Sequence, residues 1–390
     1  MGDGARAKTS FSRHDRSPPT LGLIVNPVAG LGGAVGLKGT DSVEMVARAC
    51  ARGAKAQASA RTVMTLQAVR AHLADRIAVA AAPHEMGAEA ARAAGFNSRT
   101  TGRIRAGAST PEDTKAIAAA MVEAGVSLIL FAGGDGTARD IYDAVGTRVP
   151  VVGIPAGVKM HSAVYATNPR SAAALVIGFF EQRWPVREVE VMDIDEAAFR
   201  CGAVSAKLYG YLEAPFARHL IQGVKMGQAA GGGAALDAIA ADVVEHMEPG
   251  CLYILGPGTT VRAISHRLGL AETLLGVDLV KDGRLLAADV TEADILDALV
   301  AGGREGVKIV VTPIGGQGHF LGRGNQQISA AVVRQVGRDN IILVATPEKL
   351  TSLGAVLLVD TGDPVADEIL SGYIRVVTGY AAEAICRVAG

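Results

Sequence analysis

The segment FAGGDGTARD (131–140) places a single carboxylate among three glycines, directly after an apolar run. Glycine has no Cβ, so the backbone N–H groups of such a turn can approach a phosphate closely. Asp135 lies at the tip of the predicted turn. A carboxylate repels phosphate, so it needs a chemical reason there: it can take a proton from an attacking hydroxyl, or hold Mg²⁺ that bridges phosphates. The predicted phosphate-binding residues are Gly133, Gly134, Gly136 and Thr137.

A glycine turn with a solvated aspartate is the structural alternative for this segment. Five defined positions that follow a clear strand are more specific than a lone Gly-x-Gly, and they favour the phosphate-binding interpretation. We therefore predict that Asp135 is the catalytic residue.

Four other glycine-containing segments follow or end apolar runs: NPVAGLGG (26–33), GIPAGVKMHS (153–162), LGPGTT (255–260) and TPIGGQGHFLGRGNQQIS (312–329). Lys159 and Arg323 can supply positive charge to a phosphate, and a loop as polar as 312–329 is costly to order unless a ligand binds it. Plain turns and capped helix starts are the alternatives for the shorter segments. The predicted nucleotide- and phosphate-binding residues in these segments are Asn26, Gly30, Gly32, Gly33, Gly157, Lys159, His161, Gly258, Thr259, Thr260, Gly315, Gly316, Gln317, Gly318, Arg323, Asn325 and Gln326.

Alternating strands and helices must position these loops. Apolar runs predict buried strands, and segments with helix-capping or terminating residues predict helices between them. The predicted strands are 21–27, 77–83, 126–133 and 149–157, and the predicted helices are 40–53, 84–95 and 109–125. This alternation is typical of an α/β fold with a doubly wound parallel sheet, in which ligands bind at the carboxyl ends of the strands.

The pattern changes from about Val186 onward. Segments 186–195 and 198–215 show partial alternation, which predicts antiparallel strands, and α/β alternation returns after Gly233. We therefore predict a nucleotide-binding domain followed by a second domain with antiparallel strands and further α/β elements. The predicted divisions are a disordered tail at 1–18, the first domain at 19–185 and the second domain at 186–390.

Composition excludes several functions. The 390 residues include 38 basic and 39 acidic side chains, and aromatic residues make up 4%, which argues against nucleic-acid binding. The four cysteines form no CxxC pair, so a zinc site or disulfide framework is not expected. No apolar run has the length of a membrane span, and the N-terminal residues lack the apolar core of a signal peptide. We expect a cytoplasmic protein with small-molecule nucleotide partners and without nucleic-acid or membrane partners; homo-oligomerisation stays open.

The order of motifs carries a family resemblance. A strand that ends in NP, then the GGDGT turn, then GIPAG, resembles the superfamily of NAD kinases and of diacylglycerol and sphingosine-type lipid kinases. GGDGTARD, GIPAGVKMHSAVYATNP and TPIGGQGHFLGRGNQQIS together are similar to the ATP-NAD kinase family branch that includes the acetoin-cluster protein X. The resemblance covers most of the chain from about Leu21.

This resemblance implies an active site between an α/β nucleotide-binding domain and a second domain. It implies ATP or polyphosphate as the donor, Mg²⁺ or another divalent cation, and the 2′-hydroxyl of the adenosine ribose of NAD as the acceptor. On the matching positions, the glycines and the threonine of GGDGT would contact phosphates, and Asp135 would orient or deprotonate the acceptor hydroxyl.

Two departures from the NAD kinase pattern leave other functions open. NAD kinases carry an Asn-Glu pair that binds the nicotinamide nucleotide, and no such pair occurs in this sequence. Their second domain is mostly β, whereas α/β alternation returns here. One alternative is a non-catalytic nucleotide-binding accessory protein of a catabolic pathway. The other is a lipid kinase, which ranks lower because no basic amphipathic helix stands out.

Overall fold

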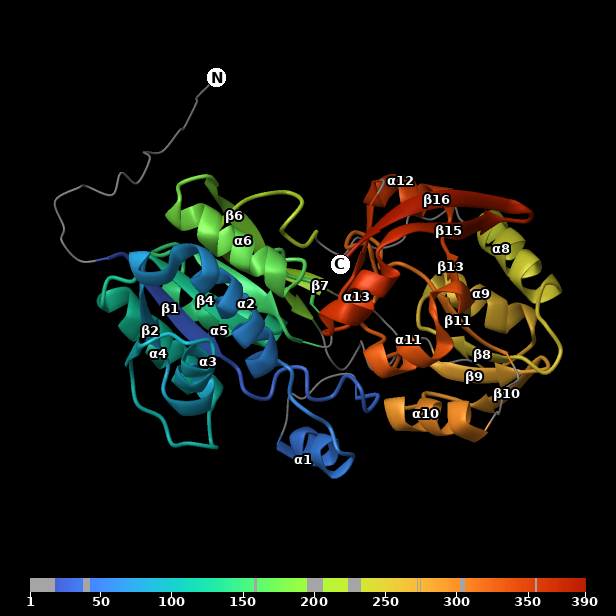
Figure 1. The fold of residues 1–390 in the computed structure, drawn as a ribbon, viewed down its shortest axis with the longest axis horizontal. Coiled ribbons are helices and arrows are strands. Elements are labelled where there is room, and N and C mark those ends of the chain that lie inside the picture. Colours follow the sequence, from blue (N-terminus) through green and yellow to red (C-terminus); the bar gives the residue numbers. More distant parts are fainter. Residues whose placement is uncertain are drawn as a thin grey trace, which may run out of the picture.

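The computed structural model describes residues 18–37, 43–157, 160–194, 206–223, 233–271, 273, 275–301, 306–354 and 356–390. Two α/β domains lie side by side, the first drawn in blue to green and the second in yellow to red (Figure 1). The predicted tail at 1–18 lies outside the described residues except for Pro18.

The first domain contains a five-stranded parallel sheet with the strand order β3-β2-β1-β4-β5. Its central strands are apolar runs, and every residue of β4 is buried, as expected for a parallel sheet that is covered on both faces. The strands are β1 (Thr20–Val25), β2 (Ala78–Ala81), β3 (Ser98–Thr100), β4 (Leu128–Gly133) and β5 (Val151–Pro155). The parallel sheet confirms the predicted fold class.

Helices cover both faces of this sheet. Helices α2 and α6 pack together over one face, and α4 packs with α5 (Figure 1). The Thr110 side chain caps α4 in a capping box with Asp113, and the Asn168 side chain caps α6. The helices of this part of the chain are α1 (Val43–Ala51), α2 (Ala58–Leu73), α3 (Ala88–Ala93), α4 (Pro111–Glu123), α5 (Asp135–Val145) and α6 (Pro169–Phe180), with short 3₁₀ turns at Ala74–Arg76 and His84–Met86.

An antiparallel hairpin follows α6, as predicted, and it consists of β6 (Val186–Ile194) and β7 (Ala206–Pro215). Its buried residues belong to the core of the first domain; Val191 and Leu212 are examples. The hairpin buries its apolar face against α5, α6 and β5, so it packs with the first domain although it follows the predicted boundary near Val186. The chain leaves the first core only after Ile221.

The second domain contains a nine-stranded sheet with the order β10-β9-β8-β11-β13-β15-β16-β14-β12. Four neighbouring strands, β8, β11, β13 and β15, are parallel, so their carboxyl ends meet at one edge. The strands are β8 (Leu252–Leu255), β9 (Asp278–Lys281), β10 (Arg284–Ala287), β11 (Val307–Val311), β12 (His319–Leu321), β13 (Ile341–Val344), β14 (Val356–Val359), β15 (Gly372–Gly379) and β16 (Ala382–Ala389). The helices are α8 (Gly233–Glu245), α9 (Thr259–Arg267), α10 (Glu292–Ala301), α11 (Ala330–Val336), α12 (Pro347–Leu353) and α13 (Pro364–Leu370), and a 3₁₀ turn spans Arg338–Asn340.

Candidate functional site

The carboxyl ends of β1, β4 and β5 are joined by hydrogen bonds. Asn26, which follows β1, donates from Nδ2 to the Thr137 hydroxyl in α5 (3.0 Å). The N–H groups of Ala156 and Gly157, which follow β5, both donate to the carbonyl of Gly133 at the end of β4 (3.0 Å each). Three predicted segments therefore meet at one edge of the sheet, as the parallel topology requires.

Two glycines at this edge have no room for a side chain. A Cβ at Gly133 would overlap the Thr137 side chain, which crosses the turn. Gly30 has a φ of +79°, and a Cβ there would overlap the carbonyl oxygen of Ala156. The glycines of NPVAGLGG and GGDGT thus allow backbone segments to pack at distances that other residues exclude.

The Gly133→Ala variant should lose about 1–3 kcal/mol of unfolding free energy, because the new methyl group must displace Thr137 and the start of α5. Gly136→Ala is the matched control in the same motif, since a Cβ at Gly136 would meet only the Arg139 guanidinium at 3.7 Å. Urea unfolding of both variants measures the difference. Equal stabilities would show that the close approach at Gly133 does not matter.

Asp135 is the first residue of α5 and is buried, 8% exposed, which disfavours the alternative of a glycine turn with a solvated aspartate. Its Oδ2 accepts a hydrogen bond from the His161 N–H (2.8 Å), and its Oδ1 accepts from the N–H (3.0 Å) and the hydroxyl (2.6 Å) of Ser162. The His161 Nδ1 atom lies 3.3 Å from Oδ2. A carboxylate has about four acceptor positions, so Oδ2 can still accept from a further hydroxyl when Nδ1 does not donate.

The Ser162 hydroxyl is oriented from two sides. It donates to Asp135, so it accepts the hydrogen bond from the Met192 N–H of β6 (3.0 Å).

Tyr165 donates its hydroxyl to the carbonyl of Gly134 (2.5 Å). Burial, and then the Asp135 charge, raise the pKa of Tyr165 well above its ordinary value, so the phenol keeps the proton that it donates. The turn and its acid are therefore held in one geometry.

The segment 160–167, which contains His161 and Ser162, also contacts the second domain. Two of its backbone carbonyl groups accept hydrogen bonds from side chains of later residues. The Met160 carbonyl accepts from Gln222 Nε2 (3.0 Å) and from Gln317 Nε2 (2.6 Å). The Thr167 carbonyl accepts from His319 Nε2 (3.0 Å) and from Arg323 Nη2 (3.0 Å). The polar loop 312–329 thus fixes both ends of the segment that orients Asp135.

A buried ionic cluster joins α2 to this loop. The Asp360 carboxylate pairs with Arg61 of α2 and with Arg323 (2.7 Å), and all three side chains are 3–6% exposed. Burial alone would raise the pKa of Asp360, but the Arg61 and Arg323 charges outweigh it and lower that pKa. Burial, opposed by the Asp360 charge, lowers the pKa of Arg323 to about 10. Sequence analysis predicted Arg323 as a phosphate ligand; in the structure it pairs with Asp360 of its own domain and donates to the Thr167 carbonyl of the first domain.

His319 should make stability depend on pH. Burial, and then the Arg323 charge, lower the pKa of His319 from 6.5 to about 3. The unfolded chain binds a proton below pH 6.5 that the folded protein does not, so the free energy of unfolding falls by about 1.4 kcal/mol per pH unit as the pH decreases from 6.5 toward 3.

The His319→Gln variant keeps an N–H donor for the Thr167 carbonyl and cannot titrate. Between pH 7 and pH 5 the wild type should therefore lose about 2 kcal/mol more unfolding free energy than this variant. His246→Gln, at an exposed position, is the control and should keep the wild-type pH dependence. Identical slopes for the wild type and His319→Gln would contradict the assignment.

The other predicted residues lie in three places. Gly258, Thr259 and Thr260 begin α9 at the carboxyl edge of the second sheet, where Lys349 Nζ donates to the hydroxyls of Thr260 (3.4 Å) and Thr312 (3.0 Å). Asn325 bonds within its own loop, to Gly322 N–H and the Phe320 carbonyl. Lys159 lies outside the described residues. A Cβ at Gly33 would contact Gln326, so the first glycine loop meets the loop 312–329 there. Gly32 belongs to the first of these loops, and Gly315, Gly316 and Gly318 belong to the second, where Gly318 lies next to Val356 and Leu353 of its own domain.

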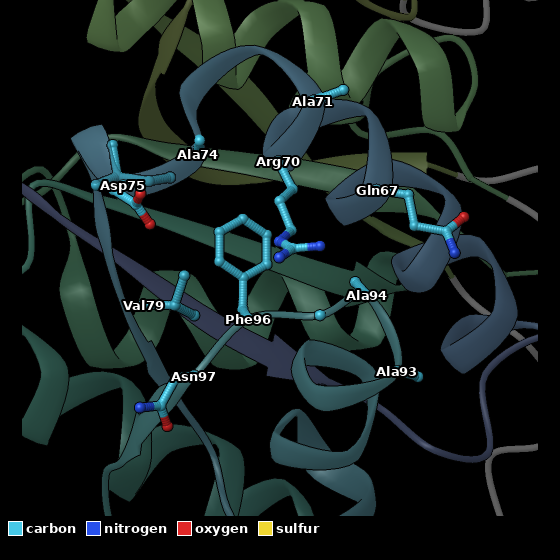
Figure 2. Close-up of a pocket in the computed structure, with 12 residues that line it drawn as sticks. Gln67, Arg70, Ala71, Ala74, Asp75, Val79, Ala93, Ala94, Phe96 and Asn97 are labelled. Atoms are coloured by element: carbon cyan, nitrogen blue, oxygen red, sulfur yellow. The ribbon is translucent and has the colours of Figure 1, made fainter.

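Pockets in the described part of the chain occur at the first sheet and between the domains. One has a volume of about 670 Å³ and is lined by Arg70, Phe96 and Asn97 (Figure 2). Its lining includes Ile77 and Asn97, which precede β2 and β3, so it lies at the amino ends of these strands, opposite the Asp135 edge. A pocket of about 330 Å³ lies between the domains, with α2 on one side and residues 322–329 and the first turn of α11 on the other.

Sequence comparison identifies the family of this two-domain α/β chain. The model of the ATP-NAD kinase N-terminal domain matches residues 21–184, and the model of the ATP-NAD kinase C-terminal domain matches residues 249–388. The two matches occur in the expected order and together cover most of the chain. The chain therefore belongs to the ATP-NAD kinase family, whose domains indicate a kinase-type phosphotransferase.

Solved structures show only a remote likeness. Two chains from Bacillus anthracis str. Sterne, described as a diacylglycerol kinase and a candidate diacylglycerol kinase, are 12% and 13% identical to this chain. Each match covers 53% of this chain and 70% of the other, with a TM-score of 0.23, which supports no conclusion. None of the curated proteins matches the sequence. Within the described ranges, no helix combines the length and the apolar character that a membrane crossing requires.

Proposed function

We propose that this protein transfers a phosphoryl group from ATP or polyphosphate to a hydroxyl of NAD or a related nucleotide in the cytoplasm. The observation that carries the proposal is the Asp135 carboxylate, which is held by Ser162 and His161 under the glycine turn at the carboxyl edge of the sheet. Membership of the ATP-NAD kinase family supports the reaction class.

The turn and the helix that follows it would bind the polyphosphate. Gly134 precedes α5 without capping it by a side chain, so the first N–H groups of α5 can donate to phosphate oxygens, and the helix dipole favours that negative charge. Asp135 would accept the proton of the acceptor hydroxyl at Oδ2 while the hydroxyl oxygen attacks the γ-phosphorus and the bond to the leaving diphosphate oxygen breaks.

Divalent cation binding would depend on the nucleotide. The described residues contain no group of three histidine, cysteine or carboxylate side chains that could hold a metal ion. Mg²⁺ commonly keeps several waters and binds substrate phosphates with few protein ligands, so the bound polyphosphate would supply its principal ligands. The cation would neutralise charge on the transferring phosphoryl group.

Label transfer from [γ-³²P]ATP with Mg²⁺ tests the function. The acceptor panel is NAD, NADH, AMP, diacylglycerol and a sphingoid base, and we expect label in a nucleotide only. Label in a lipid would replace the proposal with the lipid kinase alternative. ATP binding by calorimetry without label in any acceptor would favour the accessory-protein alternative.

A further inference from the structure

The interdomain cavity of about 330 Å³ is built from both domains, and its lining combines apolar surface with several polar and charged side chains. Gln57, which precedes α2, and Arg61 of α2 line one side, and Glu292 and Gln326 line the other. Pockets for small molecules commonly range from about 300 to 1,000 Å³, so this cavity suits a small ligand or one part of a larger ligand.

Arg61 offers unused hydrogen-bond donors to this cavity. Its Nη2 pairs with Asp360, and its Nε is buried with no hydrogen-bond partner. Among the described residues its guanidinium makes no other hydrogen bond or ion pair. A Cβ at Gly362, which also lines the cavity, would lie 3.6 Å from Arg61 Nη1. The Arg61 side chain therefore forms part of the cavity wall, although only 5% of the residue's surface is exposed.

The charges around the cavity favour an anion next to Arg61. Two guanidinium groups, of Arg61 and Arg323, share the single carboxylate of Asp360, which leaves one excess positive charge in these three side chains. The charged residues Arg334 and Asp363 also line the cavity, but they pair with each other. A phosphate anion at Arg61 would offset the excess positive charge and accept a hydrogen bond from the guanidinium.

Glu292 supplies the opposite chemistry. Its backbone N–H donates to the carbonyl of Ala34 in the glycine loop (2.9 Å), which fixes the start of α10 against the first domain. In the described parts of the chain, the Glu292 carboxylate has no hydrogen bond or ion pair. A carboxylate with two free oxygens accepts from the two hydroxyls of a vicinal diol, and it would repel a phosphate placed next to it.

The cavity is connected to the Asp135 turn through Gly30 and Ala156. Gln57 lines the cavity, and its Cβ is 3.6 Å from the position of a Cβ on Gly30. Gly30 in turn packs against the Ala156 carbonyl, and the Ala156 N–H donates to Gly133. A ligand in the cavity thus contacts the loop that forms one side of the glycine turn.

We propose that this cavity binds a pentose phosphate, with the phosphate at Arg61 and the vicinal hydroxyls at Glu292, and that this group belongs to the phosphoryl acceptor. The link to the acceptor rests on the proposed function, whereas the binding itself does not. A nucleotide such as NAD and a free sugar phosphate both present this chemistry.

Calorimetry without ATP tests the binding. Ribose 5-phosphate should bind with a 1:1 stoichiometry, and 2-deoxyribose 5-phosphate and ribose should each bind about 10-fold or more weakly, because each lacks one recognised group. In Glu292→Gln the preference for ribose 5-phosphate over its 2-deoxy analogue should disappear. Arg61→Gln should weaken ribose 5-phosphate about 10- to 100-fold. Arg70→Gln, in the other pocket, is the control and should bind like the wild type.

Comparing AMP with ribose 5-phosphate distinguishes the two sources. AMP that binds at least as tightly indicates a nucleotide acceptor, and AMP that is rejected indicates a free sugar phosphate; both results require the ribose phosphate site. The proposal is overturned if ribose 5-phosphate does not bind, or if Glu292→Gln keeps the full preference for the 2-hydroxyl. If Arg61→Gln does not fold, the preference of Glu292→Gln for ribose 5-phosphate over its 2-deoxy analogue tests the proposal by itself. If ribose 5-phosphate binds but no acceptor is labelled, the proposed binding site in the cavity stands and the proposed kinase function is refuted.

Discussion

The Asp135→Asn variant should lose at least about 100-fold in kcat and keep its ATP affinity within about threefold. This is the effect expected when the general base that takes the proton of the attacking hydroxyl is removed. The amide cannot take a proton. It also turns an N–H₂ group toward either the His161 N–H or the Ser162 donors, so one of these hydrogen bonds is lost. We therefore also expect a decrease of about 1–3 kcal/mol in unfolding free energy.

Asp143→Asn provides the matched control for this measurement. Asp143 lies in the same helix and pairs with Lys115 at the surface. Its replacement should change kcat by less than about twofold, since surface ion pairs contribute about 0–1 kcal/mol and this pair is outside the site. Unchanged turnover in Asp135→Asn, measured with the acceptor found by label transfer, would refute the role of Asp135.

Replacing Asp360 with alanine should destabilise the protein by about 3–5 kcal/mol. The substitution leaves Arg61 and Arg323 buried without their shared counter-charge, and it removes the ion pair that joins α2 to the loop 312–329. Arg323, which donates a hydrogen bond to the Thr167 carbonyl, would then carry a buried charge without its counter-ion. Because this loop also holds Met160, the variant should lose activity together with stability.

Denaturant unfolding with Glu248→Ala as the control measures this effect. Glu248 pairs with Lys308 and is 61% exposed, so its removal should cost less than about 1 kcal/mol. A loss in Asp360→Ala as small as that of Glu248→Ala would show that the cluster does not join the domains.

The central elements of the first domain were predictable because each shows a strong local signal. Fully apolar runs such as 128–132 favour buried strands where they alternate with helical segments, and parallel strands bring their carboxyl ends together. The joining of NP, GGDGT and GIPAG at one edge followed from that topology. The antiparallel hairpin was also predicted, although not the core against which it packs.

Helix α2 was not predicted, although it has 16 residues. Its buried face includes Arg61, Thr62 and Thr65, and these polar residues interrupt the apolar periodicity that marks an amphipathic helix. Their burial is explained only by partners far away in the sequence: Asp360 for Arg61, and the Pro169 carbonyl for Thr65. Long-range pairing of this kind leaves no local pattern.

The roles of several site residues were also hidden for that reason. Gln222 and His319 act through the carbonyls of Met160 and Thr167, and a carbonyl acceptor has no side-chain signature. Lys349 contacts Thr260 and Thr312 only because β8, β11 and β13 are neighbours in the second sheet. Arg323 has the composition of a phosphate ligand, and only its burial next to Asp360 shows the ion pair.

A crystal structure with a non-hydrolysable ATP analogue and Mg²⁺ tests the central claim most directly. We predict that the triphosphate lies against the N–H groups of residues 134–137, with Asp135 Oδ2 facing the γ-phosphate side of the site. A triphosphate bound at another edge of the molecule, with the Asp135 turn remote from every phosphate, would contradict the account.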